Sequence, residues 1–479
     1  MIYAITPEKM RALEQAAFAD GLPSLELMET AARAAFEALR TLVPAGSRVA
    51  FLCGPGNNGG DGLAMARLWR EAGGQARVVM PQPPATEDAK TNLARLGLSP
   101  VPLTAAAGCD AIVDALFGTG FHGAAGSPFS ELIAWANGAG CPVLSVDIPS
   151  GMNGLTGAAE GPCIRADRTV TFHRVKTGLL LTAHPELAGQ VIPADIGLAD
   201  GDCLPCAEPG DLASLLPPRA PWAHKGDCGR VTVFAGSMGM AGAAVMAAKA
   251  ALRAGSGLVT ALCPREIIPI LQTAVPNAMC RAAEERLYPP CDALLLGCGI
   301  AENEESWQTL LRLQSGGTPA VWDAGALNLL ARHPMQLGSA AVITPHLGEA
   351  ARLLGVTVGE VQRNLLSAAE RLRKKYLCNV VLKSAVTVLC AADGRLALHT
   401  VGSPALAKGG SGDALAGILA SLLGQGLPVT QAMQAACLWH GLAGRLAGER
   451  YGIRSALTEE VISCLGEAER ACRRREAER

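Results

Sequence analysis

The segment Gly54-Pro55-Gly56-Asn57-Asn58-Gly59-Gly60-Asp61-Gly62 joins a short apolar segment, residues 48–53, to a helical pattern at residues 63–72. A second apolar segment follows at residues 76–80. This order predicts a strand, a glycine-rich loop, a helix and a second strand parallel to the first. Further strand patterns at residues 111–117 and 143–147 extend the series. The N-terminal part is therefore predicted to be an α/β domain with a parallel sheet and helices on both faces.

The glycine-rich loop has the composition of a ligand-binding loop. Its glycines allow a close approach of the backbone to a ligand, and the N-terminus of the next helix attracts phosphate. An NAD-dependent dehydrogenase would carry an acidic residue about twenty positions later, but Met80-Pro81-Gln82-Pro83 stands there. That class is disfavoured. The alternative is a purely structural turn, although such a turn does not need Asn57, Asn58 and Asp61.

Polar residues also follow two other predicted strands. Asp114 precedes Gly118-Thr119-Gly120, and Asp147 precedes Pro149-Ser150-Gly151. Because parallel strands end at one edge of the sheet, these groups are expected in one crevice. Each alone could be a loop cap. Together, Asn58, Asp114 and Ser150 could offer oxygen atoms to a cation.

The pattern breaks between residues 201 and 221, where five prolines crowd the chain. A domain boundary near residue 210 is predicted there, which gives domains 1–208 and 209–479. A second α/β series follows, with strands expected at residues 230–235, 258–263, 293–297, 320–323, 341–344 and 380–383. Segments 386–390 and 396–400 are expected to form a hairpin.

A second glycine-rich loop opens a helix near the C-terminus, in the segment Ala407-Lys408-Gly409-Gly410-Ser411-Gly412-Asp413. The free N–H groups of the first helical turn form an anion hole. Asp413 beside this hole could accept the proton of a hydroxyl that attacks a phosphoryl group. The alternative is that Asp413 only caps the helix. A helix cap, however, does not require three glycines in front of it. The G-x-x-x-x-G-K-[ST] loop of P-loop enzymes is absent.

Composition narrows the class further. Hydrophobic residues make up 49% and charged residues 18% of the chain, and the net charge is −2. No nucleic-acid or membrane partner is expected. The sixteen cysteines lie mostly in apolar runs and no secretory leader is apparent, so a cytoplasmic location is expected. Cys203 and Cys206 form an isolated C-x-x-C without a second pair for zinc.

The motifs GPGNNGGDGL, DALFGTG and DIPSG, in this order, resemble the NAD(P)H-hydrate epimerase family over about residues 1–205. The resemblance implies a Rossmann-like three-layer fold that interconverts R and S hydrates. It also implies a potassium ion held by Asn58, Asp114 and Ser150. Asp147 is our hypothesis for the acid–base residue. Hydrate contacts would map to Asn57, Asn58, Gly59, Gly60, Asp61, Gly118, Thr119, Gly120, Phe121, His122, Gly123, Ala124 and Asp147.

The C-terminal loop resembles the ribokinase-like superfamily. Segments such as His224-Lys225-Gly226, Val275-Pro276-Asn277-Ala278 and Thr344-Pro345-His346 narrow the resemblance to ADP-dependent NAD(P)H-hydrate dehydratases, over about residues 211–470. The resemblance implies that ADP, accompanied by magnesium, phosphorylates the hydroxyl of NADHX or NADPHX, and that phosphate then leaves. The AMP moiety would contact Lys383, Ser384, Ala385, Val386, Thr387 and Gly412. The hydrate would contact Ala243, Gly299, His346 and Asp413.

Three positions depart from this pattern. Cys298 stands where proline is usual, Gly325 replaces an expected aspartate, and Ser384 replaces an expected glycine. None of these touches Asp413 or the glycines before it, so activity is still predicted. Without the resemblance, Lys383 could be a surface lysine and His346 a structural residue.

Two other functions stay open at this stage. One is a ribokinase-like kinase of a small molecule, such as a vitamin precursor, fused to a non-catalytic nucleotide-binding module. The other is a non-enzymatic N-terminal module for sensing or interaction. A homo-oligomer is expected, and the preference for ADP over ATP rests on the resemblance alone.

Overall fold

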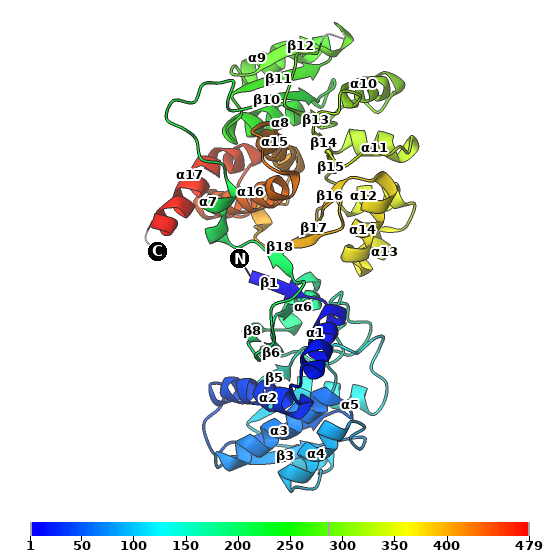
Figure 1. Ribbon diagram of the computed structural model, residues 1–479, viewed down its shortest axis with the longest axis vertical. Coiled ribbons are helices and arrows are strands. Elements are labelled where there is room, and N and C mark those ends of the chain that lie inside the picture. Colours follow the sequence, from blue (N-terminus) through cyan, green and yellow to red (C-terminus); the bar gives the residue numbers. More distant parts are fainter. Residues whose placement is uncertain (1, 286–287, 478–479) are drawn as a thin grey trace. The chain divides into compact units, whose positions relative to one another are not determined.

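A six-stranded parallel sheet organises the N-terminal part of the computed structural model, which describes residues 2–285 and 288–477 (Figure 1). The strand order is β3-β2-β4-β5-β6-β8, and every neighbouring pair is parallel. The strands are β2 (Arg48–Cys53), β3 (Gln75–Val79), β4 (Ala111–Ala115), β5 (Val143–Val146), β6 (Arg168–Phe172) and β8 (Gln190–Ala194).

Helices cover both faces of this sheet. Alternate residues of β2 enter two separate cores: Val49 and Phe51 pack with α2 and α3, whereas Leu52 packs with α5. This period-two alternation confirms the predicted three-layer arrangement. A short parallel pair joins β1 (Ile2–Ile5) to β7 (Val175–Lys176). The helices are α1 (Pro7–Ala19), α2 (Ser24–Arg40), α3 (Asn57–Glu71), α4 (Glu87–Leu96), α5 (Phe129–Gly138) and α6 (Thr177–Leu181).

A larger sheet organises the second part, in the order β12-β11-β10-β13-β14-β15-β16-β17-β18. Strands β12 to β16 are parallel, and β16, β17 and β18 are antiparallel. The expected hairpin is confirmed. The strands are β9 (Leu204–Cys206), β10 (Arg230–Phe234), β11 (Leu258–Cys263), β12 (Met279–Ala282), β13 (Ala293–Leu296), β14 (Ala320–Trp322), β15 (Ala341–Ile343), β16 (Asn379–Leu382), β17 (Thr387–Cys390) and β18 (Leu396–His399).

Two groups of helices sandwich this sheet (Figure 1). The group with α8, α15, α16 and α17 shares one alanine- and leucine-rich core with the sheet, and α10, α11, α12 and α14 lie on the other side. The helices are α7 (Leu212–Leu215), α8 (Ala241–Arg253), α9 (Ile268–Ala274), α10 (Glu304–Gln314), α11 (Gly325–Arg332), α12 (Leu347–Leu354), α13 (Val358–Arg363), α14 (Leu365–Tyr376), α15 (Ser411–Gly424), α16 (Val429–Tyr451) and α17 (Thr458–Ala477).

The chain thus forms two compact units, Tyr3–Leu204 and the described residues from Pro205 onward. The second unit is the predicted ribokinase-like α/β domain. Among the described residues, no helix combines the length and the apolar character that a membrane crossing requires.

One prediction about the deciding segment is wrong. Helix α3 begins at Asn57, not at Leu63, so Asn57, Asn58 and Asp61 lie on a helix. The glycines serve packing: a Cβ at Gly59 would come 1.9 Å from the Gly54 carbonyl oxygen, and one at Gly62 would come 2.6 Å from the Ala115 Cβ. Close contact between α3 and the sheet therefore overrides the low helix propensity of glycine.

Candidate active sites

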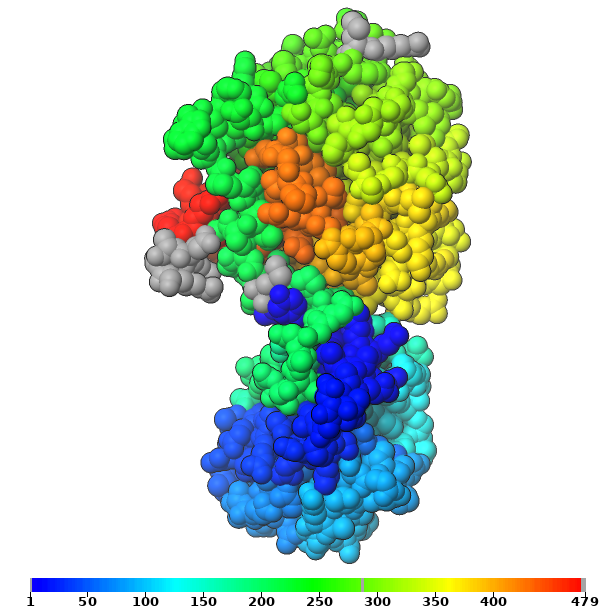
Figure 2. All heavy atoms as spheres, viewed as in Figure 1, coloured from blue at the N-terminus to red at the C-terminus, as the bar shows by residue number. Residues whose placement is uncertain are grey.

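A pocket in the first unit lies between α1, α2 and the ends of α3 and β5. Helix α1 is largely exposed on the surface of this unit (Figure 2, dark blue) and forms one wall through Met10, Glu14 and Phe18. The pocket encloses about 580 Å³, part of it open to solvent. It brings together four predicted site residues, Asn57, Asp61, Thr119 and Asp147.

Asp147 is paired with a lysine inside this pocket. Lys176 Nζ lies 2.7 Å from Asp147 Oδ1 and donates a second hydrogen bond, 2.6 Å long, to the Phe172 carbonyl oxygen. The Lys176 side chain is only 1% exposed. Asp147 has a φ of 68° directly after β5. This unusual backbone conformation turns the chain at the strand end, where the carboxylate can face a ligand.

Besides Asp147, three carboxyl groups line the same pocket, those of Glu14, Asp61 and Asp88. Burial raises the pKa of Asp61 well above its usual value, and the nearby Asp147 and Glu14 raise it further. Burial, followed by Asp147, also raises the pKa of Glu14. The pocket therefore contains carboxyl groups in contrasting environments, an arrangement typical of acid–base sites.

Two of the predicted cation ligands, Asp114 and Ser150, are joined by a hydrogen bond outside this pocket. Asp114 is fully buried, and its Oδ2 accepts hydrogen bonds from Ser145 Oγ at 2.8 Å and from the Ser150 N–H at 2.9 Å. Ser150 Oγ accepts a bond from the Phe117 N–H at 2.9 Å. The Asn58 side-chain nitrogen is buried without a partner among the described residues. A Cβ added at Gly118 would lie 3.3 Å from the Asn58 Cβ.

The remaining predicted hydrate residues of the first unit do not line the pocket. Gly60 packs against Met28, where an added Cβ would come 2.8 Å from the sulfur. Phe121 stacks on Phe117 at 4.6 Å, and His122 Nδ1 shares a 3.2 Å hydrogen bond with Asn153. Residues outside the pocket are Asn58, Gly59, Gly60, Gly118, Gly120, Phe121, His122, Gly123 and Ala124.

The second site lies at the N-terminus of α15. Gly410 adopts a left-handed conformation with φ 88° before the helix begins at Ser411, and Asp413 lies in the first turn. Ser411 Oγ shares a 3.4 Å hydrogen bond with His440 Nε2. Burial lowers the pKa of His440 to about 3, so this histidine is neutral. In the first turn of α15 the Ser411 N–H donates to the Lys408 carbonyl oxygen at 3.3 Å, whereas the N–H groups of Gly412 and Asp413 have no partner among the described residues and could bind an anion.

A buried ion pair lies beside this helix end. Lys383 Nζ lies 2.7 Å from Asp323 Oδ1, and the Thr344 hydroxyl donates a 2.7 Å bond to the same oxygen. A Cβ at Gly412 would stand 3.2 Å from Lys383 Nζ. Lys383 is therefore a largely buried lysine, not a surface lysine, and the absent side chain at Gly412 leaves space next to its charge.

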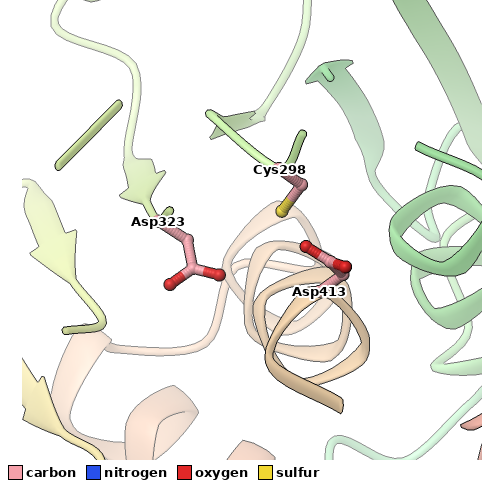
Figure 3. A group of neighbouring side chains, drawn as sticks. All are labelled: Cys298, Asp323 and Asp413. Carbon is pink, nitrogen blue, oxygen red and sulfur yellow. The ribbon is translucent and has the colours of Figure 1, made fainter. Parts of the chain in front are cut away.

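Asp413 has an environment that favours a proton-accepting group near neutral pH. Burial raises the pKa of Asp413 to about 6; the negative Asp323 and Glu349 also raise it, whereas a hydrogen bond from Cys298 and the charge of Lys383 lower it. Cys298, Asp323 and Asp413 converge from the loop after β13, the end of β14 and the start of α15 (Figure 3). A carboxylate with such a pKa is well matched to general-base catalysis.

The other residues predicted in the second unit are placed as follows. Gly299 and Ala243 are in contact, because a Cβ at Gly299 would come 2.7 Å from the Ala243 Cβ. His346 caps α12: its Nδ1 accepts bonds from the N–H groups of Gly348 and Glu349, and its side chain is 55% exposed. Lys383, Ser384, Ala385, Val386 and Thr387 run from the end of β16 into β17.

The structure also explains one departure from the expected motif. A Cβ at Gly325 would come 2.9 Å from Ile300 Cγ1 and 3.2 Å from the Gly297 carbonyl oxygen. An aspartate would therefore require the neighbouring loop to shift. Asp323, two residues earlier, is the carboxylate that pairs with Lys383.

Sequence reasoning assigned no function to four residues of these sites: Lys176, Asp323, Glu349 and Cys298. Asp323 and Glu349 lie in recognisable motifs, where their position after a strand or at a helix start could have indicated a site. Lys176 carried no such indication, because only the fold buries it beneath Asp147.

The fold and the two sites define a two-unit α/β enzyme class with an acid–base pocket and a ribokinase-like second unit. Residues 24–178 match the family model described as YjeF-related protein N-terminus, and residues 231–466 match that of NAD(P)H-hydrate dehydratase. The chain belongs to the family of bifunctional NAD(P)H-hydrate repair enzymes.

Relatives and solved structures agree with this assignment. The bifunctional NAD(P)H-hydrate repair enzyme Nnr of Escherichia coli K12 is 38% identical over 472 residues, which cover 95% of this chain and 91% of the relative. The enzyme of the same name from Coxiella burnetii is 36% identical over 472 residues, covering 95% and 96%. The ADP/ATP-dependent NAD(P)H-hydrate dehydratase of Bacillus subtilis, co-crystallised with ATP and Mg²⁺, is 29% identical with a TM-score of 0.53; the match covers 56% of this chain and 99% of that one.

Proposed function

We propose that this enzyme repairs hydrated NADH and NADPH, with residues 1–208 interconverting the R and S hydrates. Residues 209–479 then dehydrate the S form at the expense of ADP and yield AMP, phosphate and NAD(P)H. The observation that carries the proposal is the position of Asp413 in the first turn of α15, next to the unbonded Gly412 N–H and close to the Lys383–Asp323 pair.

In the second site, the hydroxyl oxygen of the hydrate attacks the β-phosphorus of ADP. Asp413 accepts the proton of this hydroxyl group during the attack. The bond between that phosphorus and the bridging oxygen breaks, and AMP leaves. The N–H groups of α15 stabilise the negative charge on the transferred group. The C–O bond of the new phosphate ester then breaks, and the neighbouring ring carbon loses a proton. Phosphate departs and the ring double bond is restored.

The substrate contacts follow from the positions around Asp413. The nucleotide would lie along Lys383 to Thr387 and against Gly412, where Lys383 offers a positive charge to the phosphates. The hydrate would lie near Ala243, Gly299 and His346. Magnesium would accompany ADP and neutralise phosphate charge; the carboxylate oxygens of Asp323 and Asp413 are donors of the type it prefers.

In the first site, Asp147 would act on the hydroxyl group at the stereocentre. The carboxylate takes the hydroxyl proton as the adjacent ring C–N bond opens, and the electron pair moves onto nitrogen. The carbon becomes a planar carbonyl. Reclosure on the other face and return of the proton yield the opposite epimer. Lys176 holds the Asp147 carboxylate in place through their 2.7 Å ion pair.

Potassium would bind through Asn58, Asp114 and Ser150 beside this pocket. A buried carboxylate, an amide and a hydroxyl form an oxygen donor set that suits a hard cation. The buried, unpartnered amide of Asn58 supports this, because turning the amide over would present its oxygen to such an ion. The ion would order the loops that follow β4 and β5.

The direct test is a product assay with purified S hydrate and ADP. The proposal predicts free phosphate, AMP and an increase in the absorbance of the reduced ring, which Asp413→Asn abolishes. A stable phosphorylated product without NAD(P)H would instead indicate a small-molecule kinase. Replacing ADP by ATP in the same assay measures the predicted preference for ADP.

Two other expectations belong to the proposal. The sixteen cysteines lie mostly in apolar runs, where they act as small hydrophobic residues, which supports a reducing compartment such as the cytoplasm. We also expect a homo-oligomer, and light scattering of the purified chain tests that expectation.

A further inference from the structure

The glycine-rich segment at the start of α15 has different neighbours at its two ends. A Cβ at Gly410 would lie 3.5 Å from Thr458 Oγ1, whereas one at Gly412 would lie 3.2 Å from Lys383 Nζ. The segment therefore meets α17 at Gly410 and the Lys383–Asp323 pair at Gly412. Because the chain is continuous, the position of the Gly412 N–H beside the ion pair depends on how the residues before it are held.

Thr458, the first residue of α17, holds the beginning of this segment. Its buried hydroxyl group donates a 3.0 Å hydrogen bond to the Gly409 carbonyl oxygen, which is 49 positions away in the sequence. The start of α17 is itself fixed, because Lys249 Nζ of α8 lies 2.6 Å from Glu459 Oε1. Since Gly409 has no side chain, its backbone is the only part through which α17 can hold it.

His440 in α16 holds the next part of the segment. Its side chain is buried, and its Nε2 shares a 3.4 Å hydrogen bond with Ser411 Oγ. The contacts of Thr458 and His440 thus fix Gly409 and Ser411, on either side of Gly410. Gly410 has a φ of 88°, a conformation that favours glycine and turns the chain into the helix. Two helices that follow α15 in the sequence therefore determine the path of its first turn.

We propose that Thr458 and His440 are positioning residues for the dehydration reaction: they hold Gly409 and Ser411 so that the N–H groups of the first turn of α15 meet the transferred phosphoryl group. The inference rests on the proposed function, in which these N–H groups stabilise the charge of the transition state. A displaced N–H group loses more of its interaction with the transition state than with bound ADP. The value of kcat should therefore fall more than the affinity for ADP.

The test is the kinetics of S-hydrate dehydration with ADP in the full-length wild type, Thr458→Val and Thr458→Ser. Valine keeps the size of threonine but removes the hydroxyl group. In Thr458→Val, kcat should fall about tenfold while KM for ADP changes by less than about threefold. Serine keeps the hydroxyl group and should bring kcat to within about twofold of the wild type.

A double-mutant cycle with Ser411 tests the role of His440. Ser411→Ala and His440→Leu should each lower kcat, and the second substitution should cost little in the presence of the first, because both remove the same contact. Multiplicative effects would show that His440 does not act through Ser411 and would overturn its role. Thermal unfolding checks the fold of each variant, and His440→Gln replaces His440→Leu in the cycle if the leucine variant does not fold.

Thr309→Val is the matched control for Thr458→Val. Thr309 is equally buried, and its hydroxyl group also donates a 3.0 Å bond to a carbonyl oxygen, that of Glu305 in α10. It accepts a further bond from Arg312, so its loss is at least as severe for the fold. The control should leave kcat unchanged. An equal fall of kcat in the two valine variants, or a wild-type kcat in Thr458→Val, would overturn the proposal.

Hydrogen–deuterium exchange gives a readout that does not depend on activity. The N–H groups of residues 409–413 should exchange faster in Thr458→Val than in the wild type, and at the wild-type rate in Thr309→Val. Unchanged exchange in Thr458→Val would contradict the assigned role of Thr458. Faster exchange in this variant, together with a wild type that does not dehydrate the S hydrate, would instead count against the proposed function alone.

Discussion

At the scale of single residues, each site is built around a carboxylate with charged groups close to it. Asp147 is held by the buried ammonium group of Lys176, and Asp413 is surrounded by Asp323, Glu349, Lys383 and Cys298. The sequence marked both carboxylates as candidates because each lies in a motif: Asp147 begins DIPSG, and Asp413 follows the glycine-rich loop. Their partners come from distant segments, so no local pattern could reveal them.

The surroundings of Asp413 predict a pH dependence. Dehydration needs the ionised carboxylate, and the pKa of Asp413 is raised to about 6. Activity should therefore be full above this value and fall about tenfold for each pH unit well below it. A kcat–pH profile with S hydrate and ADP checks this, and constant activity down to pH 4.5 would argue against Asp413 as the base.

Removing the charge of Lys176 should affect both stability and epimerisation. Lys176→Met leaves Asp147 without its buried partner, which should cost about 3 kcal/mol of unfolding free energy and most of the epimerase activity. Lys90→Met is the control, because its ion pair with Glu87 is exposed and should contribute roughly 0–1 kcal/mol. Urea unfolding measures the difference, and equal effects of the two substitutions would contradict the assigned importance of Lys176.

At the scale of elements, the sequence predicted the positions of most strands and several helices. The prediction was wrong where close packing determines the start of a helix. Apolar runs marked β2, β10 and β11 to within a residue, since parallel strands buried on both faces appear in the sequence as continuous apolar segments. Strands β6 and β8 went unassigned. The start of α3 was misplaced because three glycines in its first two turns, Gly59, Gly60 and Gly62, are typical of a loop, and only the close packing against neighbouring segments explains them.

The glycine packing of α3 makes a stability prediction. Gly59→Ala should destabilise the first unit by about 3 kcal/mol, because the new methyl group meets the Gly54 backbone. Gly56→Ala, which meets nothing within 4 Å, is the matched control and should change stability little. Thermal unfolding of both variants measures the difference in stability. A Gly59→Ala enzyme as stable as the wild type would contradict the prediction and show that α3 can move away from β2.

The N-terminus of α15 makes a binding prediction. In Gly412→Ala the methyl group lies 3.2 Å from Lys383 Nζ, within the space proposed for phosphate. The KM for ADP should rise about tenfold, equivalent to the loss of one favourable contact. Gly402→Ala, in a loop with nothing within 4 Å, should leave KM unchanged. An unaltered KM in Gly412→Ala would place the nucleotide elsewhere.

At the scale of the whole molecule, each unit has its own cores and its own site. This organisation was predictable because composition and proline content change near residue 210. The exact ligand contacts of each site were not predictable from periodicity, since they depend on how loops far apart in the sequence meet. Two self-contained sites imply two activities that substitutions can separate.

The most direct measurement follows the reduced-ring absorbance when mixed R and S hydrates are incubated with ADP and the full-length enzyme. Wild type should convert the whole mixture. Asp147→Asn should convert the S fraction at the normal rate and then slow sharply, whereas Asp413→Asn should restore no NAD(P)H yet still equilibrate the two epimers. Complete conversion by Asp147→Asn, or any rapid ADP-driven recovery by Asp413→Asn, would contradict the account.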